Sequence, residues 1–173
     1  FCLYAPADSD EVVAINGSGR APAGLEASWL REEGFDKIPQ QSAHSVTVPT
    51  AVDAWVMLNR DYGRVSLGDI LAPSIGYARN GYAITPRVAF DFSGCFELLN
   101  GDDDARAVFL PEGRSLVAGD AHRQPALAAT LSEIAEKGRD GFYKGWVAED
   151  MLAKLNGLGG KHTQADLDNA IAN

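Results

Sequence analysis

The chain has 173 residues, of which 46% are hydrophobic and 23% charged, the proportions of a globular domain or of a large part of one. Its net charge of −9 disfavours binding to nucleic acids, whose phosphates repel an acidic surface. No apolar run in the sequence approaches the roughly 20 residues that a membrane-spanning helix needs. Cys2 and Cys95 are too few for a disulfide-dense scaffold or a cysteine-rich zinc site, and we favour two thiols over one bridge.

Two β-like segments open the sequence. Residues 1–4 and 11–15 are short apolar or β-branched runs, and residues 5–10 between them have the composition of a turn, so we predict a β-hairpin. Residues 16–20 (NGSGR) follow and are predicted to form a glycine-rich turn. Because the chain begins directly in a predicted strand, with neither an initiator Met nor a signal peptide, we expect it to be a segment of a longer chain.

Helical patterns dominate the remainder. Three residue pairs have the spacing of a capping box, in which each side chain binds the other residue's backbone N–H: Thr50 with Asp53, Ser66 with Asp69, and Thr163 with Asp166. The helix after Thr50 is expected to bury Val52, Trp55 and Val56, with Leu58 as a further candidate. Apolar spacing, caps and terminal glycines predict helices over residues 25–33, 51–62, 67–80, 86 onward, 125–137, 146–155 and 164–171. A hairpin followed by helices indicates a lopsided α+β arrangement.

No group of neighbouring residues indicates an active site. The acidic run at residues 102–104 lacks the alternating ligand spacing of a calcium loop, so we predict a solvated loop. His44, His122 and His162 lie far apart in polar sequence, which favours surface or loop positions over a metal site. The sequence has no Gly-x-Ser-x-Gly motif, and a chain that begins with Phe offers no N-terminal threonine nucleophile. We therefore assign no catalytic residue, metal or cofactor to this chain.

The glycine-rich segment at residues 16–20 has two interpretations. Glycines after a strand allow backbone amides to approach a ligand, and Arg20 supplies a forked donor that suits a carboxylate. The segment lacks the third glycine of a dinucleotide fingerprint and the Gly-Lys-Ser/Thr end of a P-loop. From the spacing alone, a purely structural turn is the favoured interpretation.

Ordered sequence blocks extend over nearly the whole chain. They are FCLY through ING at residues 1–17, AP at 21–22, SVTVPTAV at 45–52 with Trp55, LGDILAPSI at 67–75 with Ala78 and NGY at 80–82, QPALA at 124–128 with Thr130 and Leu131, GFYKG at 141–145, and GG at 159–160 with Thr163, Asp166 and Leu167. In this order and spacing the blocks resemble the early-to-middle part of the large subunit of the gamma-glutamyltransferase (gamma-glutamyltranspeptidase) family. Thr50 stands where that family's pattern has a glycine.

This resemblance implies a fold and a chemistry. Members are N-terminal-nucleophile hydrolases with a four-layer αββα core. Residues 1–22 would contribute a β-hairpin and the substrate-side turn to this core, and residues 23–173 would form the helical lobe of the large subunit. A precursor cleaves itself into a large and a small subunit. The new N-terminal threonine of the small subunit attacks an amide carbonyl, and the acyl group passes to water or an amine. The implied partners are that small subunit and a small-molecule amide substrate, with no cofactor and no metal.

The resemblance departs from the family at the substrate-side turn. The usual string there is DGRETAP, whose Arg grips the glutamyl α-carboxylate, whereas residues 16–22 read NGSGRAP. Ser18 stands at the place of that Arg and Gly19 at the place of the Glu. Residues two apart in an extended segment share a face, so we expect Arg20 and Ser18 to be the substrate-binding residues of this chain.

The variant string leaves three functions open. The first is acyl transfer or hydrolysis of the gamma-glutamyl type. The second is an amidohydrolase with another acyl specificity, because NGSGRAP is similar to the string of oxamate amidohydrolase-like and cephalosporin (glutaryl) acylase-like relatives. The third is a non-catalytic helical binding module, which would fit a chain without a nucleophile, a base or a metal site of its own.

Overall fold

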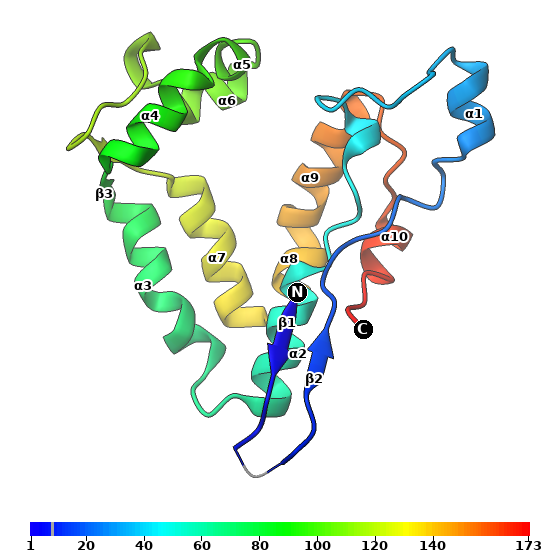
Figure 1. Cartoon of the computed structure of the whole chain (residues 1–173), viewed down its shortest axis with the longest axis vertical. Helices are drawn as coiled ribbons and strands as arrows, with labels where there is room; N and C mark the ends of the chain where they lie inside the picture. The colour runs from blue at the N-terminus through cyan, green and yellow to red at the C-terminus, as the bar shows by residue number, and fades with distance from the viewer. Residues whose placement is uncertain (8) are drawn as a thin grey trace. The chain divides into compact units, whose positions relative to one another are not determined.

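The computed structural model describes residues 1–7 and 9–173, which divide into two compact units (Figure 1). Unit 1 comprises residues 1–67 and 133–173, and unit 2 comprises residues 68–132. Both units are rich in helices, and each contains one two-stranded antiparallel sheet. The chain is therefore an α+β segment, as predicted. The assignment of residues 1–22 to the core of a sandwich and of residues 23–173 to a helical lobe stays a prediction. The described residues include no helix long and apolar enough to cross a membrane.

The predicted hairpin at the start of unit 1 is confirmed. Strand β1 (Cys2–Tyr4) pairs antiparallel with β2 (Val13–Ile15), and Cys2 lies opposite Ile15. The turn predicted between them includes Asp8, which lies outside the described residues. At the end of β2, Asn16 exchanges two backbone hydrogen bonds with Asn173, at 2.5 and 3.2 Å. The last residues of the chain thus lie beside the exit of this strand.

The helices of unit 1 pack around a small core. Tyr143, Ala148 and Leu167 are completely buried, and Ile134 is 1% exposed. The helices contributing to this unit are α1 (Ala27–Glu32), the 3-10 helix η1 (Ala43–Ser45), α2 (Ala51–Tyr62), the end of α7 (Pro125–Lys137), α8 (Asp140–Tyr143), α9 (Gly145–Gly157) and α10 (Gln164–Asp168).

Two of the three predicted capping boxes have different outcomes, and that of Ser66 with Asp69 stays a prediction. The box of Thr163 and Asp166 is present, although α10 ends at Asp168 and does not reach Ile171. The box of Thr50 and Asp53 is wrong, because the Thr50 side chain makes no cap hydrogen bond. The Asp53 carboxylate instead accepts hydrogen bonds from residues far along the chain, and this tertiary contact outweighs the local cap. On the same helix the predicted burial is confirmed for Val52 and wrong for Trp55, which is 47% exposed in this chain.

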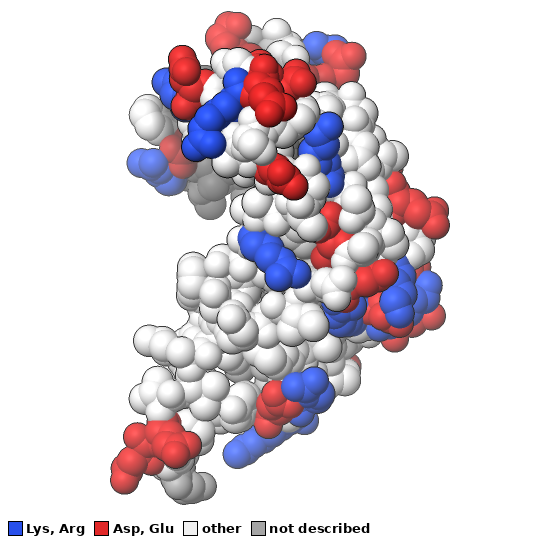
Figure 2. Space-filling view, turned by 90° about the vertical axis from the view of Figure 1, so that its right-hand side faces the viewer, with Lys and Arg blue, Asp and Glu red and all other residues white. Residues whose placement is uncertain are grey.

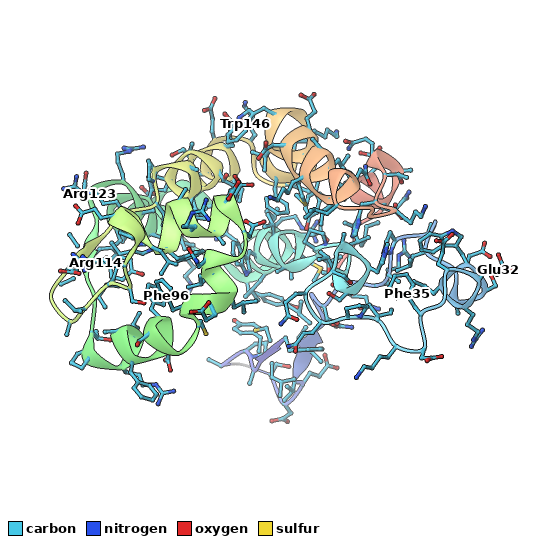
Figure 3. The ribbon with its side chains drawn as sticks, turned by 90° about the horizontal axis from the view of Figure 1, so that it is seen from above. Glu32, Phe35, Phe96, Arg114, Arg123 and Trp146 are labelled. Carbon is cyan, nitrogen blue, oxygen red and sulfur yellow. The ribbon has the colours of Figure 1, made fainter. Side chains whose placement is uncertain are left out.

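Unit 2 contains the other predicted helices and a sheet that the sequence did not reveal. Its elements are α3 (Leu67–Asn80, with Pro73 inside), β3 (Tyr82–Ala83), α4 (Pro86–Gly94), α5 (Phe96–Asn100), α6 (Asp103–Phe109), the 3-10 helix η2 (Pro111–Gly113), β4 (Ala121–His122) and the first turns of α7. Next to β4, Arg123 Nε donates to the Asn80 carbonyl at 3.0 Å, which ties this strand to the end of α3 (Figure 3). Strands of two residues are too short to have a recognisable sequence pattern.

The acidic run at residues 102–104 begins a helix, so the loop prediction is wrong. The Asp102 side chain accepts a hydrogen bond from the Ala105 N–H at 2.9 Å as the N-cap of α6. Asp103 and Asp104 occupy the first turn, where negative charge interacts favourably with the helix dipole. On the face shown in Figure 2, acidic and basic side chains lie interspersed.

Two of the three histidines, predicted at surface or loop positions, are buried: His122 lies in strand β4, which makes its prediction wrong, whereas His162 does lie in a loop. His122 is 2% exposed, and its ring stacks on Phe109 and meets Phe92 and Tyr82 edge to face. His162 is also 2% exposed, and its Nε2 lies 3.0 Å from the Val46 carbonyl. The polar sequence around His122 and His162 did not indicate their burial, because the residues that pack against them come from distant segments of the chain. Cys2 and Cys95 are free thiols.

Candidate functional site

Residues 16–20 (NGSGR) form neither a helix, a strand nor a turn, so the predicted glycine-rich turn is wrong. Neither Gly17 nor Gly19 has a positive φ. Glycine is required there by close packing: a Cβ on Gly17 would lie 2.8 Å from the Ala54 Cβ, and one on Gly19 would lie 1.6 Å from the Val48 carbonyl oxygen. The Val48 N–H also donates to the Arg20 carbonyl at 2.8 Å. The two glycines therefore let the segment lie directly against its neighbours in unit 1.

Alternate residues of this segment, Asn16, Ser18 and Arg20, line one pocket. The pocket has a volume of about 490 Å³. Ser18 and Arg20 both line it, so the structure brings the two predicted binding residues together. The other lining residues are Asn16, Gly19, Val48, Thr50 and a second wall formed by Asn169, Ala170, Ile171 and Asn173.

The pocket combines one cation with neutral polar groups. Arg20 is the charged residue among its described lining residues, its side chain is exposed, and Nη2 lies 3.5 Å from the Asn169 carbonyl. The Ser18 hydroxyl donates to Asn16 Oδ1 at 2.7 Å, which leaves the hydroxyl oxygen as an acceptor. The Thr50 hydroxyl is buried and has no hydrogen-bond partner among the residues that the structure describes. A guanidinium with neutral donors and acceptors around it suits the carboxylate of a small molecule.

Asp166 connects the Arg20 side of the pocket to helix α10. One carboxylate oxygen accepts from the Ala23 N–H at 2.8 Å, and the other accepts from the Thr163 N–H at 2.9 Å and from its hydroxyl at 2.7 Å. Burial acts to raise the pKa of Asp166, but these hydrogen bonds outweigh it and hold the pKa below its ordinary value. The charged carboxylate thus fixes the segment after Arg20 to the helix that leads into residues 169–173.

The comparison with known proteins decides the family. The sequence model described as gamma-glutamyltranspeptidase matches residues 1–172. The chain belongs to the gamma-glutamyltranspeptidase family. The family inferred from the ordered sequence blocks is thereby confirmed, and the chain is a segment of a protein from a family of hydrolases and acyltransferases.

Curated relatives of this gamma-glutamyltranspeptidase-family chain include two different amide-cleaving types. The glutathione hydrolase-like YwrD proenzyme of Bacillus subtilis is 33% identical over 167 residues, covering 96% of this chain and 31% of the relative. The oxamate amidohydrolase proenzyme of Klebsiella pneumoniae is 34% identical over 173 residues, covering 96% of this chain and 32% of the relative. The chain thus spans about a third of the length of these curated relatives.

Solved structures of the family have the same fold over nearly the whole chain. Helicobacter pylori gamma-glutamyltranspeptidase superposes with a TM-score of 0.91 at 27% identity, covering 99% of this chain and 50% of that one. The cephalosporin acylase of Bacillus halodurans superposes with a TM-score of 0.89 at 33% identity, covering 94% of this chain and 32% of that one.

The second wall of the pocket in this gamma-glutamyltranspeptidase-family chain was missed by the sequence reasoning. Arg20 and Asn169 are 149 positions apart, and residues 169–173 carry no motif that would connect them to residues 16–20. Thr50 was assigned a cap role that it does not have, so its place in the pocket was missed as well. The described residues contain no cluster of three or more His, Cys, Asp or Glu side chains that could hold a metal ion.

Proposed function

We propose that this chain is part of the large subunit of an enzyme that hydrolyses or transfers an acyl group from an amide, and that the acyl group carries a carboxylate. The observation that carries the proposal is the convergence of Arg20 and Ser18 on one polar pocket. Arg20 would bind the carboxylate bidentately. Ser18 would accept a hydrogen bond from the substrate through its free lone pairs.

In this proposal the catalytic group lies outside the chain. The curated relatives are named proenzymes, which supports a precursor that is cleaved before it acts. The cleaved enzyme would have the αββα sandwich of N-terminal-nucleophile hydrolases, with the threonine at the start of the small subunit. That threonine would attack the amide carbonyl, the amine would leave, and water or another amine would accept the acyl group from the ester.

The pocket favours an acyl group without an α-amino group. Ser18 and Gly19 replace the Arg and Glu of the usual family string, and the described lining consists of Arg20 with neutral residues. Such a lining complements a single carboxylate better than a zwitterion, because an ammonium group would lie close to a guanidinium. We therefore favour the amidohydrolase with non-glutamyl specificity over the gamma-glutamyl type.

The proposal is tested on the purified full-length protein. Intact mass and N-terminal sequencing of every chain should reveal two chains, the second of which begins with threonine. Hydrolysis of glutaryl-p-nitroanilide and of L-γ-glutamyl-p-nitroanilide is then compared, because these substrates differ by the α-amino group. We expect the larger kcat/KM for the glutaryl compound. A single uncleaved chain that hydrolyses neither anilide nor oxamate would contradict the enzyme and favour the binding module.

A further inference from the structure

A largely buried ion pair lies behind the second wall of the pocket. Arg139, which precedes α8, donates from Nε to Asp53 Oδ1 of α2 at 2.8 Å, and the two side chains are 25% and 13% exposed. The Arg139 guanidinium also lies over the ring of the completely buried Tyr143, 4.6 Å from its centroid. The Tyr143 hydroxyl accepts from the Asp53 N–H at 3.1 Å. Packing and hydrogen bonds therefore fix both members of the pair.

The remaining hydrogen bonds of this pair are made to the backbone of the second wall and its approach. Arg139 Nη2 donates to the carbonyls of Leu167, Asp168 and Ala170, at 3.3, 2.9 and 3.1 Å. Asp53 Oδ2 accepts from the Ala172 N–H at 2.8 Å. Helix α10 ends at Asp168, so its last carbonyls need partners outside the helix, and Arg139 supplies them.

Residues 169–173 have no regular secondary structure of their own. On one side they are held by Arg139 and Asp53, and on the other side Asn173 pairs with Asn16. Neither Arg139 nor Asp53 lines the pocket, whereas Asn169, Ala170 and Ile171 do. The ion pair can therefore affect a bound molecule only through the position of the wall.

We propose that Arg139 and Asp53 are positioning residues that hold residues 169–173 at the separation from Arg20 at which the pocket accepts its carboxylate. This inference rests on the proposed function. The full positioning effect needs an arginine at position 139, because the planar fork of its guanidinium reaches Asp53 and three carbonyls at once. The single ammonium of a lysine cannot reach all of them. A wall displaced by about 1 Å would weaken binding, because bound groups tolerate little misplacement.

The test uses the full-length processed protein with the variants Arg139→Ala, Arg139→Lys and Asp53→Asn. Glutarate binding is measured by calorimetry, and KM and kcat are measured with glutaryl-p-nitroanilide. Hydrogen exchange of the Ala172 amide reports the order of the wall itself. We expect Arg139→Ala to raise Kd and KM about tenfold and to change kcat less than about threefold. Arg139→Lys should give an intermediate effect, and millimolar guanidinium should partly restore binding to Arg139→Ala.

The matched control is Lys144→Ala, which removes the Lys144–Asp140 ion pair of the neighbouring helix. That pair is 3.1 Å long, and both side chains are 57% exposed, unlike the largely buried pair of Arg139 and Asp53. We expect Lys144→Ala to leave Kd, KM and exchange unchanged.

If Arg139→Ala speeds exchange at Ala172 and leaves Kd and KM unchanged, the pair is merely structural and the inference is overturned. If Arg139→Ala does not fold, Arg139→Lys and Asp53→Asn give the same test. A wild-type protein that neither binds glutarate nor cleaves the anilide would instead overturn the proposed function.

Discussion

Replacing Gly19 by Ala tests whether the pocket depends on close backbone packing. The added Cβ would lie 1.6 Å from the Val48 carbonyl oxygen, 2.7 Å from the Val48 carbonyl carbon and 3.1 Å from Thr47 Oγ1. Contacts shorter than 3.0 Å essentially never occur for a Cβ, and the two nearest atoms are backbone atoms that cannot turn away. The segment carrying Ser18 and Arg20 must therefore move away from Val48.

The cost can be worked out from these contacts. Overpacking of this kind costs about 1–3 kcal/mol. The hydrogen bond from the Val48 N–H to the Arg20 carbonyl, 2.8 Å long, would break and add about 1 kcal/mol. We therefore expect Gly19→Ala to lower the free energy of unfolding by about 2–4 kcal/mol. Because Arg20 is the next residue, the same displacement should raise KM for a substrate with a carboxylate.

The assay is urea denaturation followed by circular dichroism, together with steady-state kinetics. Gly24→Ala is the matched control in the same connecting segment, because its new Cβ would lie 3.4 Å from the Lys161 carbonyl oxygen, an ordinary contact. We expect that variant to stay within about 1 kcal/mol of the wild type. If Gly19→Ala and Gly24→Ala are equally stable and equally active, the close packing of the NGSGR segment does not form the pocket.

Three further variants test separate features of the fold. Burial lowers the pKa of His122, so the unfolded state binds a proton more readily than the folded state as the pH falls through about 6.5. Stability should therefore decrease as the pH falls below about 6.5, by at most about 1.4 kcal/mol per pH unit, and His122→Phe should flatten this dependence in urea denaturation. Asp166→Ala removes the partner of the Ala23 N–H and the capping box, and should cost about 1–3 kcal/mol in the same assay at pH 7. Thr50→Val removes a buried hydroxyl that has no hydrogen-bond partner among the described residues, so thermal unfolding should occur at an unchanged or higher temperature. A lower unfolding temperature would contradict this assignment, because it would mean that the hydroxyl makes a hydrogen bond.

Local patterns predicted the elements whose causes lie within a few residues. The helix over residues 125–137 has the predicted bounds, because its apolar spacing, first-turn proline and terminal glycine all act locally. The capping box of Thr163 and Asp166 was predicted for the same reason. The hairpin was also recoverable, since its two runs are separated by a turn-rich segment.

The errors occur where distant residues compete with a local pattern. Asp53 has the spacing of a cap partner, yet Arg139 and Ala172 bind its carboxylate across 86 and 119 positions of sequence. The glycines at 17 and 19 suggested a turn, but neighbouring backbone and side chains pass too close for a Cβ. The second wall of the pocket could not be predicted from residues 169–173, because its position depends on hydrogen bonds with Arg139, Asp53 and Asn16, which lie far away in the sequence.

The central claim is that Arg20 binds the carboxylate of the acyl group in the Ser18–Arg20 pocket. The most direct measurement compares Arg20→Ala with the wild-type processed enzyme on glutaryl-p-nitroanilide and on butyryl-p-nitroanilide, which lacks the carboxylate. Losing a charge-assisted hydrogen-bond pair of about 1.5–3 kcal/mol should raise KM for the glutaryl substrate at least tenfold. KM for the butyryl substrate should stay within about twofold, because that substrate makes no such bond. An unchanged KM for the glutaryl substrate, or an equal rise for both, would contradict the assignment of Arg20.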